Sequence, residues 1–136
     1  MQFKDIIGQR PLINRLTRII DSGRISHAQL FFGKNGYGGL ALALAYAQYL
    51  NCENRVNYGT VDEERELRAD SCGCCPSCKK YQQLAHSDLH FVFPSAATKA
   101  VSSNHSSKDF MKEFHSYLLE NNYYVQLEGF FEYLDR

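Results

Sequence analysis

Four of the five cysteines stand close together in the chain, between positions 72 and 78. Cys72, Cys75 and Cys78 repeat at intervals of three, and a tight turn between two such cysteines presents both thiolates to one Zn²⁺ ion. Cys52 can return from the end of an earlier apolar segment as the fourth sulfur of a tetrahedral shell. The spacing therefore predicts a structural zinc site formed by Cys52, Cys72, Cys75 and Cys78, with Cys74 as a spare.

Two other interpretations of the cysteines stay open. Residues 75–78 read Cys-Pro-Ser-Cys, which has the C-x-x-C form of a dithiol redox motif. Such a motif normally follows a strand of a βαβ unit, whereas this one follows further cysteines. Ordinary buried thiols are the third interpretation, and the density of cysteines disfavours it. His86 or His90 would be able to replace a sulfur, but we expect neither to be a ligand.

A second candidate site is the glycine loop, residues 33–39. Its spacing fits the phosphate-binding pattern G-x-x-x-x-G-K-[ST] up to the second glycine, Gly38. Gly39 and Leu40 then stand where the pattern needs the lysine that contacts the β- and γ-phosphates and the hydroxyl that holds Mg²⁺. We predict a degenerate loop kept for its shape, without ATP as a cofactor. Its candidate nucleotide-binding residues are Gly33, Gly36, Gly38, Gly39 and Leu40.

Three alternatives remain for the glycine loop. An active nucleotide hydrolase would need another cation, and Lys34 lies on the wrong side of the loop to supply it. A plain strand-to-helix turn would need no ligand. Residues 36–41 also satisfy the dinucleotide pattern G-x-G-x-x-A, but no second strand with an acidic end follows about 20 positions later.

Helices and short strands are expected to position the glycine loop. Apolar residues recur at helical spacing from Pro11 until Gly23, where the helix should stop. Residues 28–32 are a short apolar run, predicted to be a buried strand that leads into the loop. A nearly charge-free helix over 39–50 should follow and be buried on most sides.

The rest of the chain alternates charged and apolar segments. Residues 53–70 carry many charges and no apolar period, so we predict a solvated excursion. A helix is expected over 79–85, and a second buried strand, ended by proline, over 88–94. Residues 95–107 are small and polar. The capping-box pair Ser106 and Asp109 then precedes an amphipathic helix, and a last apolar segment covers 130–134.

The composition excludes several classes of protein. Fifteen Lys and Arg balance fifteen Asp and Glu, so the chain has no standing basic field with which to bind nucleic acid by itself. Hydrophobic residues make up 44% of the chain, enough for a real core. The longest apolar run, residues 40–47, is too short to cross a bilayer, and no signal peptide is visible. We expect a cytoplasmic protein with no membrane partner.

Several motifs taken together resemble the bacterial clamp-loader AAA+ family, with delta-prime subunits of DNA polymerase III as the nearest group. The resemblance covers Phe3 to about Pro94. It implies the same four zinc ligands that the spacing predicts, and a non-hydrolysing subunit, because delta-prime members commonly lose the lysine and hydroxyl of the phosphate loop. The motifs are Phe3-x-Asp5-Ile6-Ile7-Gly8-Gln9, His27-Ala28-x-Leu30-Phe31-Phe32-Gly33, the glycine loop, Cys52, Asp70-Ser71-Cys72-Gly73-x-Cys75-x-x-Cys78 and His86-x-Asp88.

The resemblance implies an α/β fold of the P-loop NTPase, AAA+-like type, with a parallel sheet, flanking helices and an inserted four-cysteine zinc module. Residues 1–52 would carry the degenerate loop, 53–80 the zinc insert, and 81–136 a continuation of the α/β domain that is truncated at its C-terminus. Walker B, the sensor residues and the arginine finger should lie further on.

The function that the resemblance implies is to help load the sliding clamp on primed DNA during replication, as a subunit of the DNA polymerase III holoenzyme with no catalytic residue of its own. The expected partners are the gamma/tau and delta subunits and, indirectly, the sliding clamp and primed DNA. An ATP-hydrolysing subunit of the gamma/tau type is the alternative, and a dithiol redox module is a more distant one.

Overall fold

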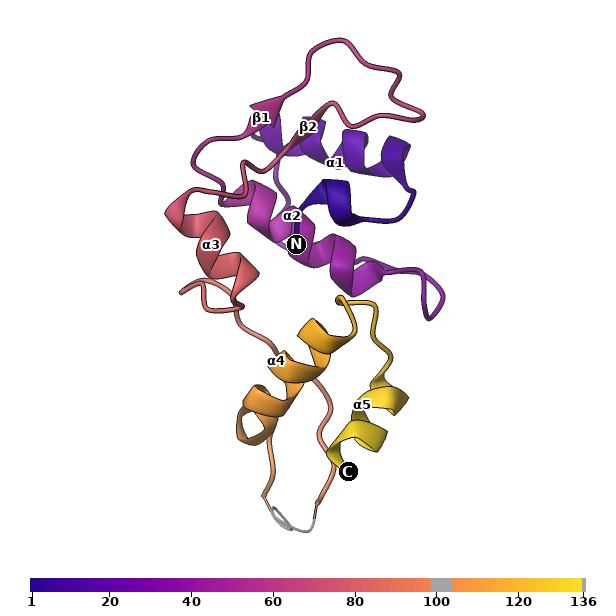
Figure 1. The fold of residues 1–136 in the computed structure, drawn as a ribbon, viewed down its shortest axis with the longest axis vertical. Helices are drawn as coiled ribbons and strands as arrows, with labels where there is room; N and C mark the ends of the chain where they lie inside the picture. The colour runs from indigo at the N-terminus through magenta and orange to yellow at the C-terminus, as the bar shows by residue number, and fades with distance from the viewer. Residues whose placement is uncertain (99–103, 136) are drawn as a thin grey trace.

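The computed structural model describes residues 1–98 and 104–135. Figure 1 shows an elongated molecule in which α1, α2 and a small sheet form one end, α4 and α5 the other, and α3 lies at the side between them. The helical elements are η1 (Phe3–Asp5), α1 (Arg10–Asp21), α2 (Gly39–Leu50), α3 (Pro76–Gln82), η2 (Ser107–Phe110), α4 (Met111–Glu120) and α5 (Leu127–Leu134). The sheet pairs β1 (Val56–Asn57) with β2 (Ala69–Asp70) in antiparallel fashion.

One hydrophobic cluster joins α1 to α2. Pro11 occupies the first turn of α1, where its missing N–H costs nothing, and the apolar period places Ile13, Leu16 and Ile20 on one buried face. The bounds of α2 and its burial on most sides agree with the prediction from sequence. The cluster consists of Phe3, Ile6, Ile13, Leu16, Ile20, Ala41, Leu42, Ala45, Tyr46, Tyr49 and Ala69.

A second, aromatic cluster packs α4 against α5 and the extended segment before them. The predicted capping box is confirmed, because the Ser106 backbone N–H donates to Asp109 Oδ2 at 2.8 Å ahead of the helical segment. Phe114 stacks on Phe93 with ring centroids 4.0 Å apart and meets the edge of Phe130 at 5.2 Å. These ring contacts explain why two short helices pair at this end of the molecule.

The two predicted buried strands are wrong for this structure. Residues 28–32 and 88–94 form no strand, and Leu30, Phe32 and Val92 are 87%, 93% and 92% exposed. A strand needs neighbours to pair its backbone N–H and C=O groups, and no described segment lies alongside either stretch in a ladder. The parallel sheet expected from the sequence is therefore absent from the described residues.

The excursion over residues 53–70 is also not simply solvated. It holds both strands of the sheet and folds over α1, because the buried Asn14 side chain binds its backbone. Asn14 Nδ2 donates to the carbonyls of Glu63 and Glu66 at 3.1 and 2.8 Å, and Asn14 Oδ1 accepts from the Arg68 N–H at 2.9 Å. Hydrogen bonds from one helix thus add to the few apolar contacts of this segment, which come from Leu67 and Ala69.

Other elements differ in smaller ways from the expectations. The helix predicted over 79–85 begins at Pro76, because the Cys75 side chain caps it by accepting the Cys78 N–H. The last apolar segment forms α5, which begins at Leu127. Part of the predicted small, polar segment, residues 99–103, lies outside the described residues. No helix within the described ranges has the length and apolar character needed to cross a bilayer.

Candidate metal centre and glycine loop

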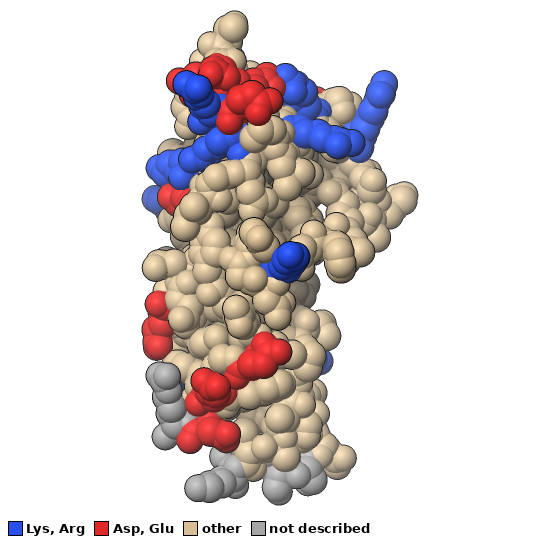
Figure 2. Space-filling model, turned by 90° about the vertical axis from the view of Figure 1, so that its right-hand side faces the viewer, with Lys and Arg blue, Asp and Glu red and all other residues tan. Residues whose placement is uncertain are grey.

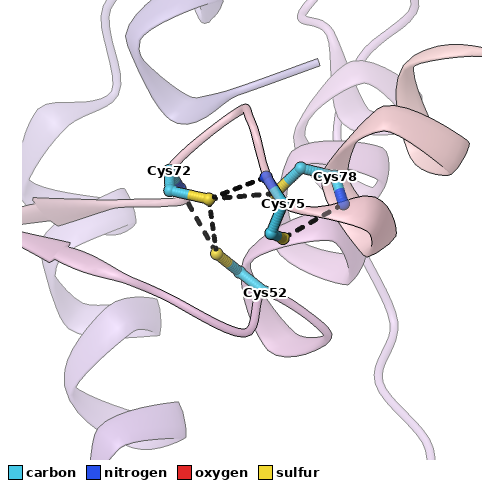
Figure 3. A group of neighbouring side chains, drawn as sticks. All are labelled: Cys52, Cys72, Cys75 and Cys78. Carbon is cyan, nitrogen blue, oxygen red and sulfur yellow. Dashed lines mark hydrogen bonds between the residues drawn. The ribbon is translucent and has the colours of Figure 1, made fainter.

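The structure brings four cysteine sulfurs to one point. The Sγ atoms of Cys52, Cys72, Cys75 and Cys78 all lie within 4.8 Å of one another and point toward a common centre (Figure 3). Two of the separations are 3.6 Å, from Cys52 to Cys72, and 3.9 Å, from Cys72 to Cys78. Four sulfurs bound at about 2.3 Å in a tetrahedron would lie about 3.8 Å apart. The group could hold a metal ion and is compatible with zinc.

Three separate elements carry these sulfurs. Cys52 stands just beyond the C-terminus of α2, Cys72 follows β2, and Cys75 and Cys78 belong to the first turn of α3. Gly73, with φ of 73°, makes the tight turn after Cys72 that a residue with a side chain would resist. A metal ion in this position would join the excursion to α2, the helix that the glycine loop precedes.

Backbone N–H groups already point at the sulfurs. The N–H groups of Cys72, Cys75 and Cys78 donate to Cys52, Cys72 and Cys75 Sγ at 3.3, 3.3 and 3.4 Å. Hydrogen bonds from the Cys74 and Cys75 N–H groups lower the pKa of Cys72 to about 6. Burial raises the pKa of Cys52 and of Cys78, so these two thiols need a nearby cation to become thiolates.

The remaining cysteine and the histidines stand apart from the group. Cys74 is exposed and lies outside the group. Cys75 and Cys78, the pair of the C-x-x-C motif, are both buried, which does not suit a reactive dithiol that must meet a redox partner. His86 Nδ1 accepts the Asp88 N–H at 3.1 Å, so its proton is on Nε2, which donates to Ser77 Oγ at 3.1 Å. His86 thereby ties α3 to the next segment instead of reaching the sulfurs.

The glycine loop lines a cavity at the N-terminus of α2. Gly36 and Gly38 have φ of 85° and 78°, and Gly38 is the N-cap residue of α2, with no side chain capping the helix. Such an N-terminus presents N–H groups that attract anions. The cavity measures 420 Å³, and its lining includes all five predicted residues, Gly33, Gly36, Gly38, Gly39 and Leu40.

No charge supports an anion at the first turn of α2. The residues there are Gly39 and Leu40, and Lys34 is exposed and forms no ion pair within the described ranges. A side-chain hydrogen bond holds the loop instead, because Gln9 Nε2 donates to the Tyr37 carbonyl at 2.9 Å. Its geometry offers backbone donors without the side chains that hydrolysis requires.

Sequence reasoning missed a buried polar group beside the cysteines. Asp70 is fully buried and accepts the N–H groups of Phe3 and Lys4, both at 2.9 Å. Gln48, also buried, donates to Ser71 Oγ at 3.0 Å. The Asp70 bonds fasten the N-terminus, and the Gln48 bond fastens α2, to the segment that enters the cysteine cluster. A lone amide in the otherwise apolar sequence of α2 was the available signal for this contact.

Two comparisons with known proteins point to subunits of DNA polymerase III. Residues 8–128 match the family model described as DNA polymerase III, delta subunit. The chain is 32% identical over 97 residues to DNA polymerase III subunit tau of Escherichia coli strain K12, which covers 71% of this chain and 13% of that protein. It is 30% identical over 130 residues to subunit gamma of Buchnera aphidicola from Baizongia pistaciae, covering 96% of this chain and 29% of that protein.

A third relative shows the same partial overlap. Subunit tau/gamma of Haemophilus influenzae is 28% identical over 133 residues, with 94% of this chain and 18% of that protein covered. The chain thus spans less than a third of the length of these relatives. No solved structure matches the chain.

Proposed function

Because the chain belongs to the bacterial clamp-loader AAA+ family of DNA polymerase III subunits, we propose that it acts in a subunit that does not hydrolyse ATP. That subunit would be of the delta-prime type and would help to load the sliding clamp on primed DNA. It would contribute through contacts with other subunits and not through chemistry of its own.

One observation carries the proposal: the first turn of α2 holds Gly39 and Leu40 where a hydrolase needs a lysine and a hydroxyl. The lysine would neutralise the charge that develops on the transferred phosphoryl group, and the hydroxyl would hold Mg²⁺. Within the described residues, no other cation lines the cavity except Lys34, on the exposed outer part of the loop. Backbone N–H groups alone would leave the triphosphate without the positive charge of the lysine and Mg²⁺ without the hydroxyl that holds it.

The cysteine group supports the same architectural role, as a structural zinc site. Cys52, Cys72, Cys75 and Cys78 would complete the coordination shell, so zinc would supply only cross-linking and no Lewis-acid chemistry. The cross-link would fix the excursion over residues 53–70 to the end of α2. A rigid module at this place suits a subunit that serves as a scaffold.

Isothermal titration with Mg²⁺-ATP tests the proposal on the intact protein. We expect no heat of binding, with an ATP-binding clamp-loader subunit as the positive control. Saturable binding together with release of phosphate would overturn the non-hydrolysing assignment. A reconstituted loading reaction on primed DNA provides the second test, since omission of this protein should stop loading while ATP binding by the other subunits persists.

An ATP-hydrolysing subunit of the gamma/tau type is the second candidate, favoured by the similarity of the chain to gamma and tau subunits. It predicts tight binding of Mg²⁺-ATP and release of phosphate. The same titration, with phosphate release measured beside it, decides between the two candidates.

The distribution of charge supports protein partners. Figure 2 shows basic and acidic side chains mixed at the end that carries α1 and the excursion, acidic ones at the opposite end, and a largely uncharged surface between. Residues 104–135 contain two Lys and six Asp or Glu, which does not suit contact with DNA at that end. We propose gamma/tau and delta subunits as direct partners, with the sliding clamp and primed DNA reached through them. Co-purification with those subunits tests this assignment.

A further inference from the structure

A short segment far along the chain lies against the glycine loop. This segment, residues 121–126 between α4 and α5, is named the strap here. A Cβ placed on Gly38 would lie only 2.5 Å from Cε1 of Tyr124, so the tyrosine ring rests directly on the backbone of the loop. The hydroxyl of Tyr124 accepts the Ile7 N–H at 3.0 Å. One side chain of the strap thus bridges the N-terminal segment and the glycine loop.

The strap meets the loop at more than one point. A Cβ on Gly36 would lie 3.8 Å from Nε2 of Gln126. Tyr123, Tyr124 and Val125 form part of the wall of the 420 Å³ cavity that the loop opens into. Both positive-φ glycines of the loop therefore face this segment, and a phosphate approaching the N-terminus of α2 would meet the Tyr124 ring.

The strap is held in an unusual conformation. Asn122 and Tyr123 have φ of 50° and 67°, a left-handed conformation that is rare for a tyrosine. The Tyr123 N–H donates to the Leu118 carbonyl at 2.8 Å, which ends α4, and the Gln126 carbonyl accepts from the Tyr117 hydroxyl at 3.1 Å. Strain of this kind persists only where surrounding contacts over-determine it.

We propose that the strap is a built-in cover for the glycine loop, in which Tyr124 holds the loop in shape in place of a bound nucleotide. The proposal deepens the non-hydrolysing role proposed above and rests on it, because a loop without lysine and hydroxyl gains no order from Mg²⁺-ATP. The α4–α5 pair then has a function, because it positions the strap against the loop.

Hydrogen exchange of the loop amides tests the cover. Tyr124→Ala removes both the ring and the Ile7 hydrogen bond, so exchange of residues 34–39 should become about tenfold faster, the change in an opening equilibrium that corresponds to one ordinary hydrogen bond. Tyr58→Ala, a half-exposed tyrosine in the excursion, is the matched control and should leave those amides unchanged. Equal exchange in Tyr124→Ala and the unaltered protein would overturn the proposal.

A double-substitution cycle gives a second readout, the coupling between positions 38 and 124 in the melting temperature. Gly38→Ala should lower the melting temperature through its clash with the Tyr124 ring and through its positive φ. In a Tyr124→Ala background the clash disappears, so Gly38→Ala should lower the melting temperature by less. The remaining loss would come only from the positive φ at position 38. Strictly additive losses would mean that the ring does not press on the loop.

Phosphate binding separates this proposal from the proposed function. Gly39→Lys with Leu40→Thr should bind Mg²⁺-pyrophosphate poorly while the strap is intact, and at least tenfold more tightly once Tyr124→Ala is added. Equal affinity with and without Tyr124 would refute the cover. Hydrolysis of Mg²⁺-ATP by the unaltered protein would refute both the non-hydrolysing role and the cover. Binding without hydrolysis, or unchanged exchange after Tyr124→Ala, would refute the cover alone.

Discussion

Replacing one cysteine of the metal group tests the site with little damage to the fold. Cys75→Ser removes one of the four proposed sulfur ligands, but serine is a preferred N-cap residue, so the cap that Cys75 gives to the Cys78 N–H should survive. Cys74→Ser is the matched control, since Cys74 is exposed and lies outside the group. Only the first substitution should therefore affect the metal.

The magnitude follows from the number of ligands. Structural zinc sites bind with about 10–16 kcal/mol at neutral pH, or about 3 kcal/mol for each of four thiolates. Loss of one thiolate should weaken zinc by about 100-fold to 1000-fold. The excursion should then keep its Asn14 contacts to α1 but lose its link to α2, so residues 70–80 should exchange faster than residues 62–68.

Elemental analysis and competition with a chelator measure this effect. We expect one zinc per chain in the unaltered protein and in Cys74→Ser, and none in Cys75→Ser after dialysis against a chelator that leaves the other two loaded. The same measurement reads iron, the other metal that four sulfurs suit. Equal metal content in the two variants would refute the ligand assignment, and a protein purified without metal would refute the site.

Three further predictions concern the described contacts. Asn14→Ala should lower the free energy of unfolding in urea by about 1–3 kcal/mol, because it leaves backbone groups of residues 63–68 unpaired, whereas the exposed Asn54→Ala should cost little. Phe114→Ala should cost about 3–5 kcal/mol by the same measurement, since three aromatic rings pack on it. Burial lowers the pKa of His115 from 6.5, and its Nε2 has no hydrogen-bond partner among the described residues, so the unfolded chain binds the proton more tightly. Stability should therefore fall as the pH drops below 6.5, and His115→Gln should lose this component; an identical slope in both proteins would contradict the assignment.

Local patterns predicted the helices well. The apolar period around Leu16 and the uncharged run of α2 specify helices through contacts three and four residues apart, which the sequence displays directly. The pair Ser106 and Asp109 likewise specifies a cap within one turn. The two predicted strands failed because residues 28–32 and 88–94 need partners elsewhere in the chain, which local composition does not provide.

The residues of the candidate site were also predicted from local patterns in the sequence. The spacing of Cys72, Cys75 and Cys78 is a local property, since one turn and one helix start determine where these sulfurs point. Gly39 and Leu40 are equally plain in the sequence, because the phosphate-loop pattern fixes which side chains those two positions need.

By itself, the amino-acid sequence therefore predicted the main helices, the grouping of four cysteine sulfurs and the lack of a lysine and a hydroxyl at positions 39 and 40. Only the tertiary structure decided that Asn14 binds the excursion, that Asp70 holds the N-terminus, and that Tyr124 covers Gly38. The physical reason is distance along the chain: each of these contacts joins residues dozens of positions apart. Such a contact depends on how the whole chain closes its loops and not on any pattern that neighbouring residues share.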